Sequence, residues 1–353
     1  MKRLACLALI VCLLLALALP AAAQTAFSDA AAITHTEAVQ MLTGLGLISG
    51  YRDGSFRPEE PVTRAQIAKL IALLNTDAPN ADAASFADVA ETSWALPYIS
   101  YCAAENIVTG SGGLFRPQDD VTAQELCKML LVTLGYDASR YTGARWAQNV
   151  AEDAEAVGLY HALSVRPEQY ITREAACQMI LNALQSYAVH GFSADGTPLY
   201  VLDELMNPRT YLEIRYNAVR YAGVVMANEA ANLSGGAAMP AGVTQLAGYH
   251  LDFAVSTGAE LLGRKVSLYV QNGQVLGVPC EVPEEVCGTF TSAERLQQLV
   301  QTTDYRLTEN TAYYYNNAPA DASVLQTLTA PCTIAAIDHD GDLGIDLVRI
   351  TDP

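Results

Sequence analysis

The chain has 353 residues, enough for several domains, and carries 20 basic and 38 acidic residues, a net charge of −18. This negative balance argues against a nucleic-acid partner, because such binding depends on clustered Lys and Arg that neutralise phosphates. Only six cysteines follow residue 23, too few for a disulfide scaffold, and their spacing matches no zinc site.

The first 23 residues have the pattern of a secretory signal peptide. Lys2 and Arg3 form a basic start, residues 4–19 are apolar, and Ala21–Ala23 supply a cleavage site of small residues. The apolar run is shorter than the roughly 20 residues that a bilayer span needs. We therefore expect a secreted chain, out of the membrane after cleavage, whose mature part has 18 basic and 38 acidic residues.

A pattern then recurs three times between residues 27 and 187. In each copy an Arg-Pro pair is followed, five residues after the Pro, by a Thr that opens a helix-periodic apolar run: Thr63, Thr122 and Thr172. Each copy predicts a helix, a loop and a second helix, too small to bury its own apolar face. The three copies should therefore pack around one core. Their expected bounds are 27–78, 84–137 and 140–187.

The start of each second helix is where binding chemistry is expected. The segments Thr63–Gln66 and Thr122–Glu125 match a capping box, which satisfies free backbone donors and needs no ligand. Arg64 and Arg173 are different, because a cation in the first helical turn opposes the macrodipole unless an anion sits there. Free N–H groups and a guanidinium together would suit a carboxylate. The alternative is that both are ordinary exposed arginines.

These segments resemble the S-layer homology (SLH) domain family. The resemblance rests in the first copy on Phe27–Asp29, on the loop Gly50–Pro58 and on Val62–Gln66. The second copy matches through Phe86–Val89, Trp94-Ala95, Phe115–Pro117 and Val121-Thr122, and the third through Trp146-Ala147 and Ile171–Glu174. The third copy is degenerate, since it lacks the Gly-rich turn and the Phe.

The resemblance implies a pseudo-threefold array of helical units with grooves between neighbours. It also implies non-covalent attachment to secondary cell-wall polysaccharide, often pyruvylated, in the bacterial envelope, so that the pyruvate carboxylate would be the missing anion. Carried over residue by residue, it assigns polysaccharide binding to Asp53, Thr63, Arg64, Gln66, Thr172 and Arg173.

Departures from the family pattern predict unequal grooves. Ala123 stands where the second copy should have an Arg, so its groove is expected to bind weakly or only to pack. The third copy has Glu174-Ala175 in place of Ala-Glu, and we expect a poor groove there. Trp94 and Trp146 occupy matching positions, which favours a structural role over sugar stacking. Weak additional sites would still add avidity on a polymer.

The remaining residues, 190–353, predict a β-rich part of one or two small barrel-like or sandwich-like domains. Alternating Val, Tyr and Thr replace the helical runs, and Asn272-Gly273 between two apolar stretches predicts a hairpin. Residues 292–300 predict a short helix. Cys127 and Cys177 are expected as small core residues, whereas Cys280 and Cys287 could pair or stay free.

No cofactor is expected, with one calcium candidate. The segment 338–346 places Asp338, Asp340, Asp342 and Asp346 near one another, as in a calcium loop. However, Leu343 stands where such a loop has Gly, and no Glu closes it. A solvated turn between two paired strands, residues 333–337 and 347–350, is the favoured interpretation.

The sequence thus predicts an α+β, multi-domain, non-enzymatic surface protein. The SLH array would anchor it to wall polysaccharide and display the β-rich part. No nucleophile elbow, HExxH or phosphate loop is present. The alternatives are a wall-active glycan hydrolase whose paired acids leave no local signature, and a chain whose β-rich part self-associates into a surface lattice.

Overall fold

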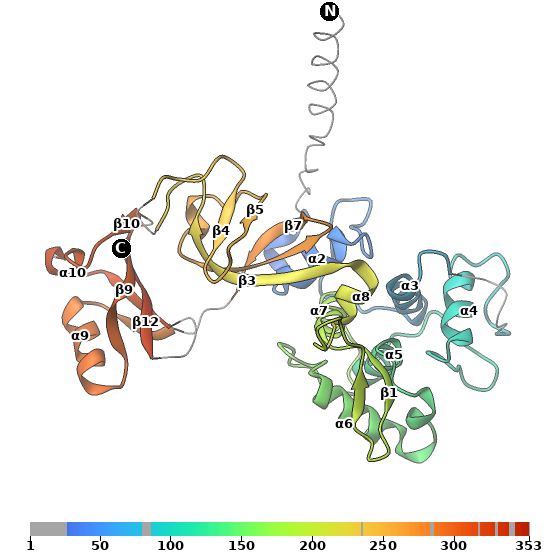
Figure 1. Cartoon of the computed structure of the whole chain (residues 1–353). Helices are drawn as coiled ribbons and strands as arrows, with labels where there is room; N and C mark the ends of the chain where they lie inside the picture. Colours follow the sequence, from blue (N-terminus) through green and yellow to red (C-terminus); the bar gives the residue numbers. More distant parts are fainter. Residues whose placement is uncertain are drawn as a thin grey trace, which may run out of the picture.

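A computed structural model of the chain describes residues 27–79, 86–233, 236–282, 286–316, 318–328, 331–338 and 343–352. The predicted signal peptide lies outside the described residues. Helices fill the N-terminal half and β-sheets the C-terminal half, as the sequence predicts. Figure 1 shows one sheet lying between the helical half and a second sheet that ends the chain.

The helical half contains three units, which we call units 1, 2 and 3 and which correspond to the three copies of the repeat. Each has a first helix, a loop and a second helix. The α-helices are α2 (Thr36–Gly44) and α3 (Arg64–Asn75) in unit 1, α4 (Leu96–Ala104) and α5 (Ala123–Thr133) in unit 2, and α6 (Trp146–Val157) and α7 (Arg173–Gln185) in unit 3. Short 3-10 turns are η1 (Ala30–Ala32), η2 (Ala138–Tyr141) and η3 (Gly143–Arg145).

Backbone hydrogen bonds join the three units in cyclic order. The first N–H of each second helix donates to a loop carbonyl of another unit: Arg64 N to Asp119 O at 2.9 Å, Ala123 N to Gln169 O at 2.9 Å, and Arg173 N to Glu60 O at 2.8 Å. The next N–H in each helix donates to the carbonyl of the repeated proline, which is Pro117, Pro167 or Pro58. The recurring Arg-Pro segment therefore supplies acceptors to a neighbouring helix start that lacks intrahelical partners.

An aspartate fixes the loop of each of the first two units. Asp29 accepts hydrogen bonds from the backbone N–H groups of Phe56 and Arg57, both at 2.7 Å. Asp88 does the same for Phe115 and Arg116, at 2.8 and 2.6 Å. These bonds hold the two arginines in the left-handed backbone region, at φ values of 58° and 60°. They also lower the pKa of both carboxyl groups, because they favour the charged form.

One apolar core runs through all three units. Its largest fully buried side chains include Phe56, Ile67, Phe115 and Leu126. Cys127 and Cys177 are buried in this core, as predicted. Leu212, which follows the third unit in the chain, belongs to the same core. The core therefore extends beyond the three units into the segment that follows them.

The C-terminal half begins with a small hairpin and a helix and continues as two open sheets. The hairpin is β1 (Val189–Phe192) with β2 (Pro198–Tyr200), followed by α8 (Tyr211–Tyr216). The middle sheet has the order β5-β4-β3-β6-β7, with β3 (Ala218–Ala227), β4 (Thr244–Leu246), β5 (Asp252–Phe253), β6 (Lys265–Gln271) and β7 (Gln274–Glu281). The turn η4 (Ala259–Leu261) precedes β6.

The terminal sheet has the order β10-β9-β12-β11-β8, with β9 and β12 parallel. Its strands are β8 (Val286–Phe290), β9 (Arg306–Tyr315), β10 (Ala318–Ala320), β11 (Thr333–Ile337) and β12 (Gly344–Thr351), with helices α9 (Ala293–Thr302) and α10 (Val324–Thr327).

The local predictions for this half are confirmed, whereas the predicted barrel-like fold is not. The Asn272-Gly273 hairpin joins β6 to β7, α9 covers the predicted helix, and β11 pairs with β12. Neither sheet closes into a barrel within the described residues, because each has two edge strands in its order. Cys280 and Cys287 are both free thiols.

Polar contacts tie the middle sheet to unit 1. Glu37 of α2 accepts hydrogen bonds from Arg220 Nε of β3 at 2.8 Å and from Tyr269 OH of β6 at 2.6 Å. Burial alone would raise the pKa of Glu37, but these donors outweigh it and the pKa is lowered. At the other end of unit 1, Arg215 of α8 donates to Leu74 O at the last turn of α3. The middle sheet is therefore held against α2, and α8, which leads into β3, is held against α3.

Candidate polysaccharide-binding grooves

Two grooves lie between the units, and corresponding residues line them. Groove 1, of about 340 Å³, is lined by residues 47–51 of unit 1 and by Gln66, Lys69, Trp94 and Arg173. Groove 2, of about 610 Å³, is lined by residues 107–111 of unit 2 and by Glu125, Lys128, Trp146 and Arg64. Each groove thus combines a loop and a second helix of one unit with side chains from the other two.

The arginine in each groove comes from the preceding unit in the cycle. Arg173 of unit 3 lines groove 1, with its guanidinium carbon 4.8 Å from the ring centre of Phe56. Arg64 of unit 1 lines groove 2, with its guanidinium carbon 4.9 Å from the ring centre of Phe115. The cation–π geometry is the same, so the two phenylalanines position the two guanidinium groups alike.

This arrangement changes the meaning of Ala123. Because Ala123 stands where an arginine was expected, the sequence predicted that the groove of the second unit lacks a guanidinium. That groove is instead lined by Arg64 of unit 1. Arg64 and Gln66, adjacent in one motif, line different grooves. By the cyclic order of the backbone hydrogen bonds, Ala123 lies at the boundary between units 2 and 3. We call this boundary the third position. The sequence prediction therefore placed the missing arginine at the wrong groove, because the arginine of each unit lines a groove of the neighbouring unit.

The third position has lost the groove-lining residues. Ala123, which is fully buried, replaces the arginine, Ala175 replaces the Gln or Glu, and Gln178 replaces the lysine. Glu174 instead turns to unit 1, where it accepts hydrogen bonds from the backbone N–H groups of Thr34 and His35 at the start of α2. The Glu174-Ala175 departure noted in the sequence therefore builds an interface between units 3 and 1, with Glu174 only 3% exposed.

Both tryptophans line a groove. Trp94 is 56% exposed and lies at groove 1, with its ring 6.4 Å from that of Tyr98. Trp146 begins α6, lies at groove 2 and is half-buried, with one side packed against the core. The structural role at the helix entry therefore fits Trp146, and sugar stacking by either ring stays a prediction.

The helix-start amides are not available to an anion. Thr63 and Gln66 form the predicted capping box, with Thr63 N donating to Gln66 Oε1 at 2.8 Å, and Thr122 and Glu125 form another. Thr172 accepts from Ala175 N at 3.3 Å. The two N–H groups before these go to the loop carbonyls of the next unit. The expectation of free N–H groups at the helix starts is thus wrong, and the cationic groups that line the grooves are side chains.

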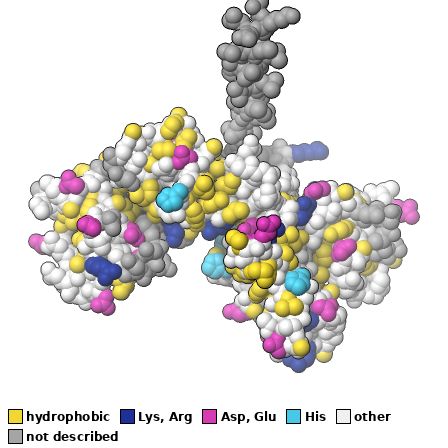
Figure 2. Space-filling view, viewed as in Figure 1, with side chains coloured by type: hydrophobic (Ala, Val, Ile, Leu, Met, Phe, Trp, Pro, Cys, Tyr) yellow, Lys and Arg dark blue, Asp and Glu magenta, His cyan; other side chains and the backbone are white. Residues whose placement is uncertain are grey.

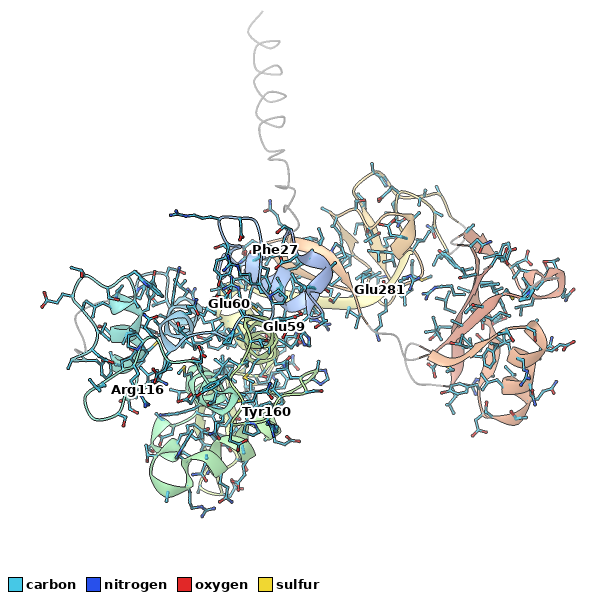
Figure 3. The ribbon with its side chains drawn as sticks, turned by 180° about the vertical axis from the view of Figure 1, so that it is seen from behind. Phe27, Glu59, Glu60, Arg116, Tyr160 and Glu281 are labelled. Carbon is cyan, nitrogen blue, oxygen red and sulfur yellow. The ribbon has the colours of Figure 1, made fainter. Side chains whose placement is uncertain are left out.

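The other predicted site residues lie outside the groove linings. Asp53 is exposed in the loop of unit 1, where it accepts from Ser55 N at 3.0 Å and pairs with Arg57 at 3.0 Å. Thr63 and Thr172 act as helix caps. Figure 3 labels Arg116, which lines groove 2, and Glu60, which lies in the corresponding loop of unit 1.

The calcium candidate is only partly described. Asp340 and Asp342 lie outside the described residues, and Asp338 Oδ2 accepts from Leu343 N at 3.0 Å. Among the residues that the structure places, no group of three or more His, Cys, Asp or Glu side chains is arranged to hold a metal. Calcium at Asp338 and Asp346 stays a prediction.

Sequence reasoning missed Lys69 and Lys128 as groove residues. Both follow the repeated Thr by six residues, so the signal was present in the repeat. On the face that Figure 2 draws, the acidic side chains are scattered over both halves rather than gathered in one patch.

The N-terminal part of the chain is similar in sequence to known proteins. The S-layer homology domain profile matches residues 26–68 and 85–127. The chain is 30% identical over 152 residues to the middle cell wall protein of Brevibacillus brevis, covering 42% of this chain and 14% of that protein. It is 28% identical over 163 residues to a cellulosome-anchoring protein of Acetivibrio thermocellus, covering 41% and 36%.

An endoglucanase of a Bacillus species is 31% identical over 124 residues, which cover 33% of this chain and 13% of the enzyme. The chain therefore spans a small part of each of these relatives. No helix in the described part of the chain is long and apolar enough to cross a bilayer. The S-layer homology domain profile thus matches two of the three units, and the similarity to the cell-wall relatives covers less than half of this chain.

Proposed function

We propose that the chain anchors to the bacterial cell wall by binding secondary wall polysaccharide in grooves 1 and 2. The observation that carries this proposal is the duplication of one residue set, comprising an arginine, a lysine and a tryptophan, in two grooves built from different units. Core packing alone does not require a cation and an indole that reaches the surface at corresponding positions. The relatives named for the cell wall and for anchoring support the same function.

The ligand that we propose is a polymer with carboxylate groups, such as pyruvate ketals. Arg173 and Lys69 in groove 1 can pair with a carboxylate, and Trp94 offers an aromatic face to a sugar ring. Two grooves on one array would bind one polymer chain with avidity, since the second contact is intramolecular. We infer that the three units form a pseudo-threefold array whose third position serves as an interface.

We further propose that the β-rich half is a displayed, non-catalytic module without a cofactor. A pocket of about 430 Å³ beside β3 and β12 has an apolar lining apart from Lys265 and Asp346. Hydrolysis of glycans by the usual mechanism uses two carboxyl groups, and this described lining holds one. Measuring release of reducing ends from purified walls tests this part, and activity lost with Asp346→Asn would contradict it.

Sedimentation with purified, protein-free walls tests the anchor. Residues 24–353 should sediment with intact walls and stay in solution with walls stripped of secondary polymer. Arg173→Ala should weaken binding by roughly 10-fold or more, because it removes a charge-assisted contact. Arg166→Ala, which changes an exposed arginine away from both groove linings, is the matched control. Binding that ignores both the polymer and Arg173 would contradict the proposal.

A further inference from the structure

The loop that lines groove 1 has the middle sheet behind it. Residues 47–51, which follow α2, form one wall of groove 1. Ser49 and Gly50 of this loop also line a second hollow, of about 350 Å³, together with Val278 of β7. The loop therefore stands between groove 1 and a hollow that a strand of the β-rich half helps to line.

The same strand packs closely against the helix that leads into this loop. A Cβ atom added to Gly44, the last residue of α2, would lie 3.7 Å from Gly277 N and 3.8 Å from Cβ of Leu276. Gln40 Oε1 of α2 accepts a hydrogen bond from Cys280 Sγ of β7 at 2.9 Å. Such close packing leaves the end of α2 little room to shift.

A tyrosine of β6 joins the two helices that build groove 1. Tyr269 OH donates to Glu37 Oε1 of α2 at 2.6 Å and accepts from Gln185 Nε2 of α7 at 2.7 Å. Helix α2 leads into the loop of groove 1, and α7 begins with Arg173, which lines the same groove. Because Tyr269 is only 4% exposed, water cannot readily replace these hydrogen bonds. One hydroxyl of the β-rich half therefore fixes how the two helices lie against each other.

The corresponding part of groove 2 has no such support. Its loop, residues 107–111, follows α4. Helix α4 packs against α3, and among the described strands none makes a comparable contact with α4. The support is therefore a property of groove 1 and not of the repeat.

We propose that the middle sheet is part of the wall anchor: its contacts with α2 and α7 hold residues 45–51 and Arg173 in the arrangement that binds the polymer. Tyr269 and Glu37 are the positioning residues, and neither lines the groove. Preorganisation of this kind raises affinity, because less conformational freedom is lost on binding. The inference rests on the proposed function and adds that one sheet of the β-rich half supports groove 1 instead of only being displayed.

Hydrogen exchange of the mature chain, residues 24–353, tests this support without a ligand. Tyr269→Phe removes the hydroxyl and keeps the ring. It should speed amide exchange in residues 45–51 by roughly 5-fold and leave residues 105–111, the corresponding segment of unit 2, unchanged. Tyr249→Phe is the matched control, because it removes a tyrosine hydroxyl that is bonded within the middle sheet. It should leave exchange in both segments unchanged.

Binding in each groove separates positioning from a general loss of stability. The chain has two tryptophans, Trp94 at groove 1 and Trp146 at groove 2, so replacing either one with Phe leaves a single reporter. The probe is an oligosaccharide released from the wall polymer and too short to reach both grooves. Tyr269→Phe should weaken the affinity measured at Trp94 by roughly 3-fold or more and leave that at Trp146 unchanged. Glu37→Gln, which keeps the size of the side chain and removes its charge, should act in the same direction.

Faster exchange in residues 45–51, together with a loss of affinity confined to Trp94, is the result that the structure predicts. Exchange in that segment that Tyr269→Phe leaves unchanged would overturn the inference, and so would equal losses of affinity at both tryptophans. Either of these results would leave the wall anchor standing. Failure of the unsubstituted chain to sediment with intact walls would instead overturn the proposed function itself.

Discussion

Grooves 1 and 2 follow one design but hold their arginines differently. In groove 2 the guanidinium of Arg64 is buried, paired with Glu125 and bonded to a backbone carbonyl, so it stabilises the fold. In groove 1 the guanidinium of Arg173 donates to Ser49 O, and no carboxylate of the described residues forms a salt bridge with it. The comparison teaches that a repeated motif can carry an ion-paired arginine in one copy and an arginine without a salt bridge in another.

The largest expected effect separates these two arginines by stability. Arg64→Ala should lower the free energy of unfolding by about 2–3 kcal/mol, because it leaves Glu125 without its cation and Phe115 O without its donor. Arg173→Ala should lower it by only about 1 kcal/mol, because it removes the ring contact with Phe56 and an exposed hydrogen bond to Ser49 O but breaks no salt bridge. Urea unfolding of the two variants measures the difference. Equal losses would remove the distinction between the grooves.

The third position provides the next comparison. Glu174→Ala should lower the free energy of unfolding by about 2 kcal/mol, since it strands the N–H groups of Thr34 and His35. Gln124→Ala is the matched control, because it changes the same helix position in unit 2, where the side chain is half-buried. It should have little effect on thermal unfolding. A Glu174 variant as stable as this control would mean that units 1 and 3 are not joined by that carboxylate.

Salt should weaken binding in both grooves, with a smaller effect. Each groove is lined by more than one cation: Arg173 and Lys69 in groove 1, and Arg64, Arg116 and Lys128 in groove 2. Raising ionic strength from 0.05 to 0.5 M should therefore weaken binding to intact walls by roughly 3-fold or more, since exposed charges are screened. Sedimentation at the two ionic strengths measures this change. Binding that does not change with salt would show that these cations do not hold the polymer.

The smallest effect concerns acid. The pKa values of Asp29 and Asp88 are lowered in the fold by backbone donors, so their stabilisation is present above their unfolded pKa of about 4 and lost as pH falls through the folded values. Asp29→Asn and Asp88→Asn should therefore flatten the decline of the urea midpoint below about pH 5. Both loops are exposed, so the change will be modest. An acid slope equal to that of the unsubstituted chain would show that these bonds do not contribute.

Local structure could be predicted because it depends on nearby residues. The capping Thr63, the hairpin at Asn272-Gly273 and the helix after Ser292 all follow from short-range chemistry. The position of Arg64 could not be predicted, because it depends on how units close into a cycle. The same closure uses the helix-start N–H groups that seemed available for a ligand.

The β-rich half shows the same limit in another way. Strand pairing between β11 and β12 follows from alternation and a short turn. The parallel pairing of β9 with β12 and the two open sheets depend on contacts between distant segments, for which the sequence carries no local signal.

The most direct test of the account is a crystal structure of residues 24–353 with an oligosaccharide released from the wall polymer. The account predicts ligand density in groove 1 against Arg173, Lys69 and Trp94, and in groove 2 against Trp146. It predicts no ligand at the third position, beside Ala123 and Ala175. Ligand bound only on the β-rich half, with both grooves empty, would contradict the claim that these grooves hold the chain to the wall.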